Sequence, residues 1–331
     1  MKLRAPRLRA VGAGVAAMAL HAAGQAASPP PLQDFGTGDG AYYTTVGGQQ
    51  VDPYFVNKGF IIAMQAGVPL QAEFLQWLRW LLPRQRSDGG FDRYCRREGQ
   101  GWHSCMKADA DDSMAATTMQ MLTLALQKRW VPDDQRAAAR RAIDRASGLL
   151  ASLLNTQTQI YRVFADADTY YLMDNAEVYE GLRAVGAAAS ANQLAAAIRR
   201  QFLDGTQWKP AIPEYATPQF YPHTLASTYL WSTSVLPRAE SAAMAAQWLA
   251  QHGNTWLSRS GDRFAWGLVA WQIHRDAPLQ AACWRASLRP FDPATGWTVL
   301  DALVDQSLAS RHIGTQCALA AMPAARPAAA P

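Results

Sequence analysis

The sequence lacks any long apolar segment after its first residues. No run of 18 apolar residues occurs beyond position 28, and a membrane-spanning helix needs about 20, so a protein with several membrane spans is excluded. Charged residues are also sparse, at 17% against 49% hydrophobic residues in a chain of 331. These proportions are typical of one large globular domain with a substantial buried core, and they argue against a disordered chain.

No acidic residue precedes Asp34, so the basic residues at the start of the chain are not neutralised locally. The formal net charge is +5, and Lys2, Arg4, Arg7 and Arg9 supply most of it. The rest of the chain is therefore nearly neutral and lacks the basic surface that binds nucleic acid, so we expect no nucleic-acid partner.

The basic residues at the start are followed by an apolar stretch over 10–23 and by small residues over 24–27. This order is typical of a secretory signal peptide. We expect cleavage of residues 1–27, a periplasmic or secreted mature protein, and no stable membrane insertion. Three prolines at 29–31 then predict an extended lead-in over residues 28–51.

Cysteine is scarce, with four residues in the chain, at Cys95, Cys105, Cys283 and Cys317. Neither the near pair nor the distant pair has the CxxC spacing of a zinc site, so we expect no metal and no cofactor. An even number of cysteines in an oxidising compartment favours disulfides. We expect Cys95 to pair with Cys105 and to hold Trp102 near the site described below, and we leave a Cys283–Cys317 bridge open.

Strand signals are nearly absent between residues 52 and 310, where Ala- and Leu-rich helical patterns dominate. One set of segments has a single charged face, which predicts outer helices. These are 70–82, 133–154, 190–203, 238–251 and 278–288. A second set is apolar or small on all sides, which predicts helices buried all round. These are 56–66, 113–126, 176–185, 224–235, 264–273 and 299–308.

Inner and outer segments alternate, which predicts an all-α fold, an (α/α)6 toroid of six helical hairpins. We place the toroid at residues 52–318, with a disordered Ala/Pro tail over 319–331, and we expect a monomer. Because the inner helices of such a toroid run parallel, the residues ahead of each one line a shared cleft.

Carboxylates and aromatic residues precede the predicted inner helices. Aromatic faces stack on sugar rings and carboxylates bind sugar hydroxyls, so we expect a polysaccharide or oligosaccharide in the cleft. The acidic cluster Asp109, Asp111 and Asp112 exceeds the needs of a helix cap, and crowding raises the pKa of at least one carboxyl. Asp174 and Glu177 repeat the arrangement one hairpin later, where a capping box is the simpler interpretation.

The segment Asp109-Ala-Asp111-Asp-Ser-Met-Ala-Ala resembles the Asp-Gly-Asp-x-x-Ile-Ala-x-Ala signature of the family-8 glycoside hydrolases, within the six-hairpin glycosidase superfamily. Asp262-Arg263-Phe-Ala-Trp266 resembles the segment that carries that family's catalytic base. The family's general acid is a Glu in a Ser-Glu-Gly-Gln motif, and Val51-Asp52-Pro53-Tyr54 occupies that place here.

The resemblance implies hydrolysis of a glycosidic bond, with Asp262 as the base and Asp111 binding a distorted sugar. Asp52 is then the candidate acid, and Asp109 is the reserve for that role. Arg263 is expected to orient the base. The other expected substrate-binding residues are Trp102, Asp112, Tyr170, Asp174, Glu177, Tyr221 and Trp266.

Two alternatives remain open from the sequence. Asp109-Ala-Asp-Asp-Ser113 also resembles the acid motif of class II terpene cyclases, and Gln85-Arg-Ser-Asp-Gly-Gly-Phe91 resembles their Gln and aromatic repeat. A toroid that has lost its acid is also compatible with a non-catalytic protein that binds or assembles exopolysaccharide.

Overall fold

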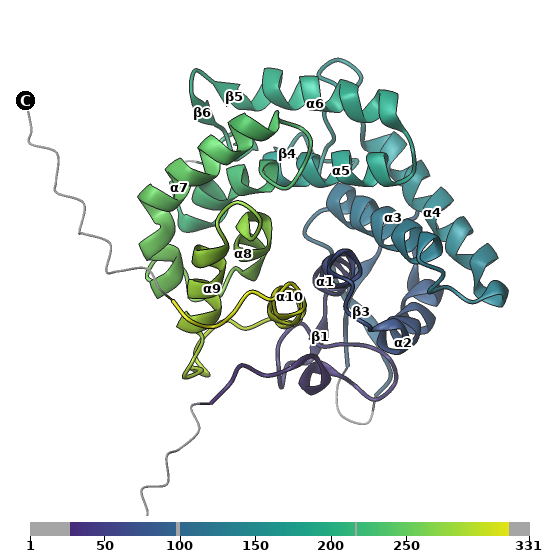
Figure 1. Cartoon of the computed structure of the whole chain (residues 1–331). Coiled ribbons are helices and arrows are strands. Elements are labelled where there is room, and N and C mark those ends of the chain that lie inside the picture. Colours follow the sequence, from purple (N-terminus) through teal and green to yellow (C-terminus); the bar gives the residue numbers. More distant parts are fainter. Residues whose placement is uncertain (1–26, 97–99, 216, 318–331) are drawn as a thin grey trace, which may run out of the picture.

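The computed structural model describes residues 27–96, 100–215 and 217–317. Helices form a ring of inner elements surrounded by a second ring of outer elements (Figure 1). The inner elements are α1 (Pro53–Ala66), α3 (Asp111–Gln127), α5 (Leu172–Ala184), η4 (Ser227–Leu230), α8 (Gly267–Ile273) and α10 (Val299–Ser310). Each contacts the next, and α10 returns to α1, so the inner ring is closed. The chain therefore folds as the expected (α/α)6 toroid.

The outer helices are α2 (Gln71–Leu81), α4 (Asp133–Leu153), α6 (Ala188–Phe202), α7 (Arg238–Ser258) and α9 (Pro278–Ser287). Helix α4 buries one stripe, which includes Ala139, Ala142, Ala146 and Leu150, and exposes its charged residues. Helix α3 is buried over most of its circumference. This difference is the one that the sequence pattern predicts for outer and inner helices.

The fourth inner element is shorter than the predicted helix over 224–235. The chain makes one irregular turn, η3 (Phe220–Thr224), and then the short η4. The side chain of Thr228 donates to the carbonyl of Leu225, and that of Thr233 donates to the carbonyl of Leu230. Hydroxyl side chains that bind nearby carbonyls compete with regular helix formation.

Helix α8 begins three residues after its predicted start. Trp266, the residue before it, has the left-handed conformation with φ 48°, which cannot continue a right-handed helix. The segment that carries Asp262 therefore forms a loop at the end of the ring.

No helix follows α10 in the part of the chain described, and the N-terminal segment covers it instead. The short helix η1 (Leu32–Phe35) packs on α10 with Leu32 and Phe35 buried. The indole of Trp297 donates to the carbonyl of Pro30 at 3.0 Å. The predicted lead-in is thus folded onto the ring.

Short strands lie between the helices. β1 (Gln50–Val51), β2 (Asp92–Cys95) and β3 (His103–Lys107) form an antiparallel sheet. β4 (Tyr170–Tyr171) pairs with β7 (Ala211–Ile212), and β5 (Leu203–Asp204) pairs with β6 (Gln207–Trp208). Cys95 is bonded to Cys105, and Cys283 is bonded to Cys317, so the expected first disulfide is confirmed and the second is present.

The predicted signal peptide, apart from Ala27, and the predicted tail over 319–331 lie outside the described residues. Among the helices that the structure describes, none has the length and apolar character needed to cross a membrane.

Candidate active site

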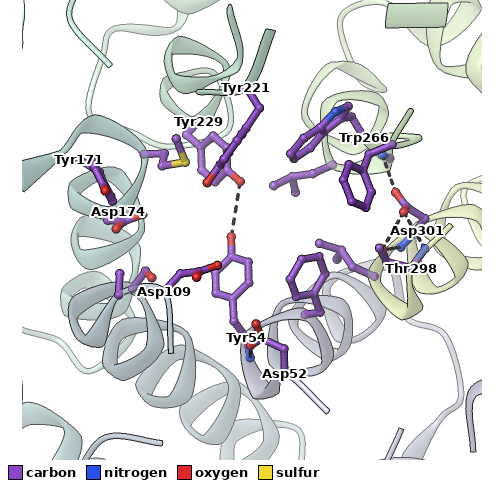
Figure 2. A pocket seen from close by; sticks show the side chains of 18 of the residues that line it. Asp52, Tyr54, Asp109, Tyr171, Asp174, Tyr221, Tyr229, Trp266, Thr298 and Asp301 are labelled. Atoms are coloured by element: carbon purple, nitrogen blue, oxygen red, sulfur yellow. Dashed lines mark hydrogen bonds between the residues drawn. The ribbon is translucent and has the colours of Figure 1, made fainter. Parts of the chain in front are cut away.

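A cavity of about 280 Å³ opens where the N-terminal ends of the inner elements meet (Figure 2). All six inner positions contribute to it, through residues at or just before each helix start. Its lining includes five carboxyl groups and a set of aromatic rings: Asp52, Asp109, Asp174, Asp262, Asp301, Tyr54, Phe55, Tyr171, Tyr221, Tyr229, Phe264 and Trp266. Six of the residues predicted from the sequence are among them: Asp52, Asp109, Asp174, Tyr221, Asp262 and Trp266.

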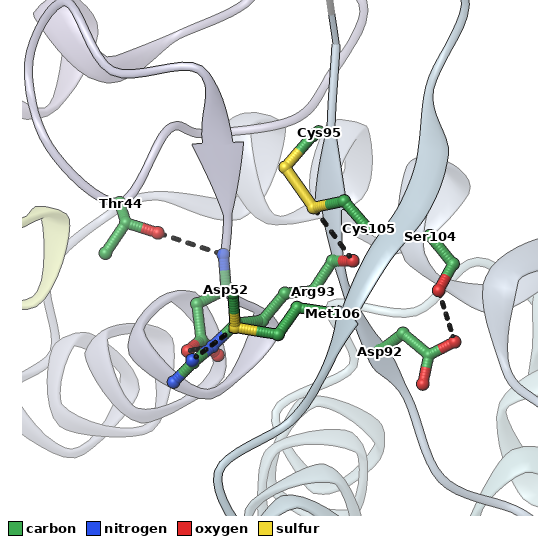
Figure 3. The surroundings of a disulfide bond; sticks show 8 residues. All are labelled: Thr44, Asp52, Asp92, Arg93, Cys95, Ser104, Cys105 and Met106. Atoms are coloured by element: carbon green, nitrogen blue, oxygen red, sulfur yellow. Dashed lines mark hydrogen bonds and ion pairs between the residues drawn. A yellow bond between two sulfur atoms is a disulfide. The ribbon is translucent and has the colours of Figure 1, made fainter.

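Asp52 caps helix α1 and is also ion-paired. Its Oδ1 accepts from the backbone N–H of Tyr54 at 3.0 Å, and its Oδ2 accepts from Nε of Arg93 at 2.7 Å. Arg93 lies on β2, next to the Cys95–Cys105 disulfide (Figure 3), and its Nη2 pairs with Oδ2 of Asp109. Burial raises the pKa of Asp52, while Arg93 and the cap oppose that rise. In this geometry both oxygens act as acceptors.

A second acidic cluster lies at the starts of α3 and α5, and of its three members Asp174 lines the cavity. It consists of Asp112, Asp174 and Glu177, which are 0%, 6% and 3% exposed. Each of the three carboxyls has one buried oxygen that accepts no hydrogen bond from a donor in the described chain. These oxygens are Oδ2 of Asp112, Oδ2 of Asp174 and Oε2 of Glu177. Burial, followed by the charges of the neighbouring carboxyls, raises the pKa of Asp174 well above its usual range.

Glu177 connects this cluster to the centre of the ring. Its Oε1 accepts from the hydroxyl of Tyr54 at 2.9 Å and pairs with Nζ of Lys58 at 2.8 Å. The Tyr54 hydroxyl also lies 3.5 Å from that of Tyr229, as drawn in Figure 2. Glu177 therefore positions Tyr54, whose ring lines the cavity.

Aromatic side chains form the side of the cavity near α8. The rings of Tyr221 and Trp266 stack with centroids 5.1 Å apart. Asp262 lies in the loop beside them and accepts from the backbone N–H of Phe264 at 3.1 Å. The guanidinium of Arg263 lies over the ring of Phe264, and among the described residues it makes no ion pair with Asp262.

Asp301 lines the cavity but was not among the residues chosen from the sequence. Its Oδ1 accepts from the backbone N–H of Gly267 at 2.7 Å, and Thr298 completes a capping box with it. Burial raises the pKa of Asp301 to about 6. The Thr298-x-x-Asp301 spacing ahead of an apolar run is a capping-box pattern and was the signal that could have identified it.

Three predicted site residues lie away from the cavity: Asp111, Trp102 and Tyr170. Asp111 is ion-paired with Arg86 at 2.7 Å, and Arg86 also binds Asp88 and Asp92. Trp102 packs beside Trp80, and its indole donates to Asp39 at 2.7 Å.

Tyr170 is buried, and its hydroxyl is bonded to Asn155 and Asp168. The side chains of Asp112 and Glu177 lie behind the cavity wall. In the described residues no group of three or more His, Cys, Asp or Glu has the arrangement of a metal site.

No protein-family model and no curated protein matches the sequence. Solved structures do match the fold. A mutant of Rex8A from Paenibacillus barcinonensis complexed with xylose is 11% identical with a TM-score of 0.56, over 83% of this chain and 84% of that one. A reducing end xylose-releasing exo-oligoxylanase is 14% identical with a TM-score of 0.53, over 87% of this chain and 84% of that one.

Both neighbours share the fold of this chain over most of their length, so the fold that the resemblance implies is confirmed.

Proposed function

We propose that this protein is an exported glycoside hydrolase that cleaves a polysaccharide or oligosaccharide in the cavity at the helix ends. The observation that carries the proposal is the lining itself, in which five carboxyl groups face aromatic rings within one concave site. Hydrolysis of a glycosidic bond needs one protonated carboxyl and one carboxylate on either side of the bond, and sugar rings stack on aromatic faces.

The structural neighbours support this reading because they share the toroid over most of their length. One neighbour is complexed with xylose, and the other is an exo-oligoxylanase that releases xylose from the reducing end. We therefore propose β-linked neutral glycans, xylan fragments among them, as the first substrates to test.

Asp262 is the proposed catalytic base. It lines the cavity from a loop, its Oδ1 is held by the N–H of Phe264, and it belongs to the segment that resembles the family's base motif. A base held by a backbone N–H keeps its carboxylate in a fixed orientation toward an attacking water.

The test is release of reducing ends from a panel of β-glucans, xylans and their oligosaccharides by the purified mature protein. Wild type should hydrolyse at least one of them, and Asp262→Asn should lower kcat/KM by at least about a hundredfold. Asp144→Asn, on the exposed face of α4, is the matched control and should leave the rate unchanged.

Two results would redirect the proposal. Binding of a glycan without release of reducing ends would support the non-catalytic polysaccharide-binding alternative. Turnover of an isoprenoid substrate, with no action on any glycan, would support the terpene cyclase alternative.

A further inference from the structure

Asp52 is ill suited to be the acid that the proposed reaction needs. A general acid must present a proton to the leaving oxygen, yet both oxygens of Asp52 already accept, one from Tyr54 N–H and one from Arg93. A proton on either oxygen would face an N–H donor. The geometry therefore favours an ionised Asp52 that fixes helix α1 and Arg93.

Asp174 has the opposite environment. It lines the cavity, it is 6% exposed, and its Oδ2 has no donor among the described residues. Asp112 Oδ2 is orphaned in the same way, and the two side chains lie within hydrogen-bonding reach of each other. Two acceptor oxygens can satisfy each other only when a proton lies between them.

The charges around the cluster lead to the same result. Asp112, Asp174 and Glu177 are neighbours, and in the described chain Lys58 is the cation that pairs with them, through Glu177. An ionised Asp112 and an ionised Asp174 would leave two uncompensated charges in a buried site, which is costly. The pair therefore holds a proton at neutral pH, as coupled carboxyls do.

We propose, resting on the glycosidase function above, that Asp174 is the general acid of this enzyme and that Asp112 is the positioning residue that shares its proton. The acid then comes from the third inner helix, α5, rather than from the first.

In this step the proton of the Asp174 carboxyl passes to the glycosidic oxygen as the bond from that oxygen to the anomeric carbon breaks. A water molecule attacks the anomeric carbon and gives its proton to Asp262. The products are a hemiacetal and an alcohol, and before the next cycle Asp262 releases its proton to the solvent while Asp174 takes one up from it.

The titratable and charged groups that face Asp174 come from every neighbouring element. They are Asp112 on α3, Glu177 on α5, Asp109 before α3, Tyr215 before η3, Tyr221 on η3 and Tyr229 on η4, and Lys58 on α1 reaches the cluster through Glu177.

The experiment compares a glycan that wild type cleaves with the dinitrophenyl glycoside of the same sugar. Dinitrophenolate leaves without a proton, so loss of a general acid spares the second substrate. Asp174→Asn should lose at least about a hundredfold on the glycan and less than about tenfold on the dinitrophenyl glycoside. Asp262→Asn should lose activity on both.

Asp112→Asn gives a second readout. It removes the neighbouring negative charge and leaves Asp174 as an acid with a lower pKa, so the alkaline limb of the pH profile should move to lower pH. The infrared difference spectrum between wild type and Asp174→Asn at neutral pH should show a protonated-carboxyl band that is present in wild type and absent from the variant. Circular dichroism confirms that each variant is folded.

The inference is overturned if Asp174→Asn keeps full activity or loses both substrates equally, if Asp112→Asn leaves the pH profile unmoved, or if the protonated carboxyl persists in Asp174→Asn. An inactive wild type on every glycan contradicts the proposed function itself, and the infrared signal then still decides whether the pair holds a proton.

Discussion

Asp301 makes the stability of the protein depend on pH. Its pKa is about 6 in the folded state, against 3.8 for the unperturbed side chain, because it is buried at the start of α10. A raised pKa means that the folded state binds the proton more tightly, so this stabilisation is present at low pH and is lost as the pH rises through 6. The shift corresponds to about 3 kcal/mol.

The measurement is urea unfolding of wild type and Asp301→Asn at pH values between about 3.5 and about 7.5. This range includes both the folded and the unperturbed pKa of Asp301. The free-energy advantage of wild type should shrink by about 2 kcal/mol between pH 4 and pH 7. Other buried carboxyls, such as Asp112 and Asp174, titrate in both proteins, so the difference isolates Asp301. A difference that stays constant over this range would refute the assignment.

The sequence identified which residues precede the inner helices but not which way their side chains point. Asp109, Asp111 and Asp112 are adjacent, yet Asp109 faces the cavity rim, Asp111 faces Arg86 and Asp112 lies behind the wall. At a helix start, consecutive side chains diverge by about 100°. Their directions are therefore set by the rotation of α3 against its neighbours, which a motif does not contain.

The β2–β3 hairpin is the element that ties the disulfide to the cavity. Cys95 ends β2 two residues after Arg93, and Arg93 holds both Asp52 and Asp109. Replacing both Cys95 and Cys105 with Ser should lower stability by about 3 kcal/mol on the loop-entropy estimate. It should also lower kcat/KM, because Arg93 loses its fixed position.

The second disulfide supplies the control for that experiment. Cys283 and Cys317 join α9 to the C-terminal segment, away from the residues that line the cavity. Their double replacement with Ser should cost about 4 kcal/mol with no change in kcat/KM of the folded protein. Equal losses of activity in both double variants would show that the hairpin has no special role.

The element pattern was more predictable than the site. Most outer and inner helices lie within a few residues of their predicted positions, because burial on one side or on all sides leaves its mark in the sequence. Helix α7 begins at its predicted residue but ends at Ser258, seven residues beyond the predicted end at 251. The fourth inner element and the start of α8 differ, because hydroxyl side chains and the left-handed Trp266 act through local backbone geometry. Neither effect appears in a hydrophobic pattern.

At the scale of the whole molecule, the cavity depends on closure of the ring between its first and last helices. Asp52 and Tyr54 come from the start of α1, while Thr298 and Asp301 come from the start of α10. These residues are far apart in sequence and become neighbours only because α10 packs on α1. The contact is close, because Gly59 of α1 faces Leu303 of α10.

Gly59→Ala should therefore open this seam. A Cβ at position 59 would lie 2.3 Å from Cδ1 and 3.2 Å from Cβ of Leu303, which is fully buried. Overpacking of this kind costs about 1–3 kcal/mol, and separation of α1 from α10 should also lower the rate of glycan hydrolysis.

Gly148→Ala is the matched control, because position 148 on α4 has open space around it and the change should stabilise the helix by about 0.5–1 kcal/mol. In thermal unfolding and kcat/KM measurements, Gly59→Ala should lower both Tm and kcat/KM, whereas Gly148→Ala should raise Tm and leave kcat/KM unchanged. If both variants gain stability and keep the wild-type rate, closure between α1 and α10 does not control the site.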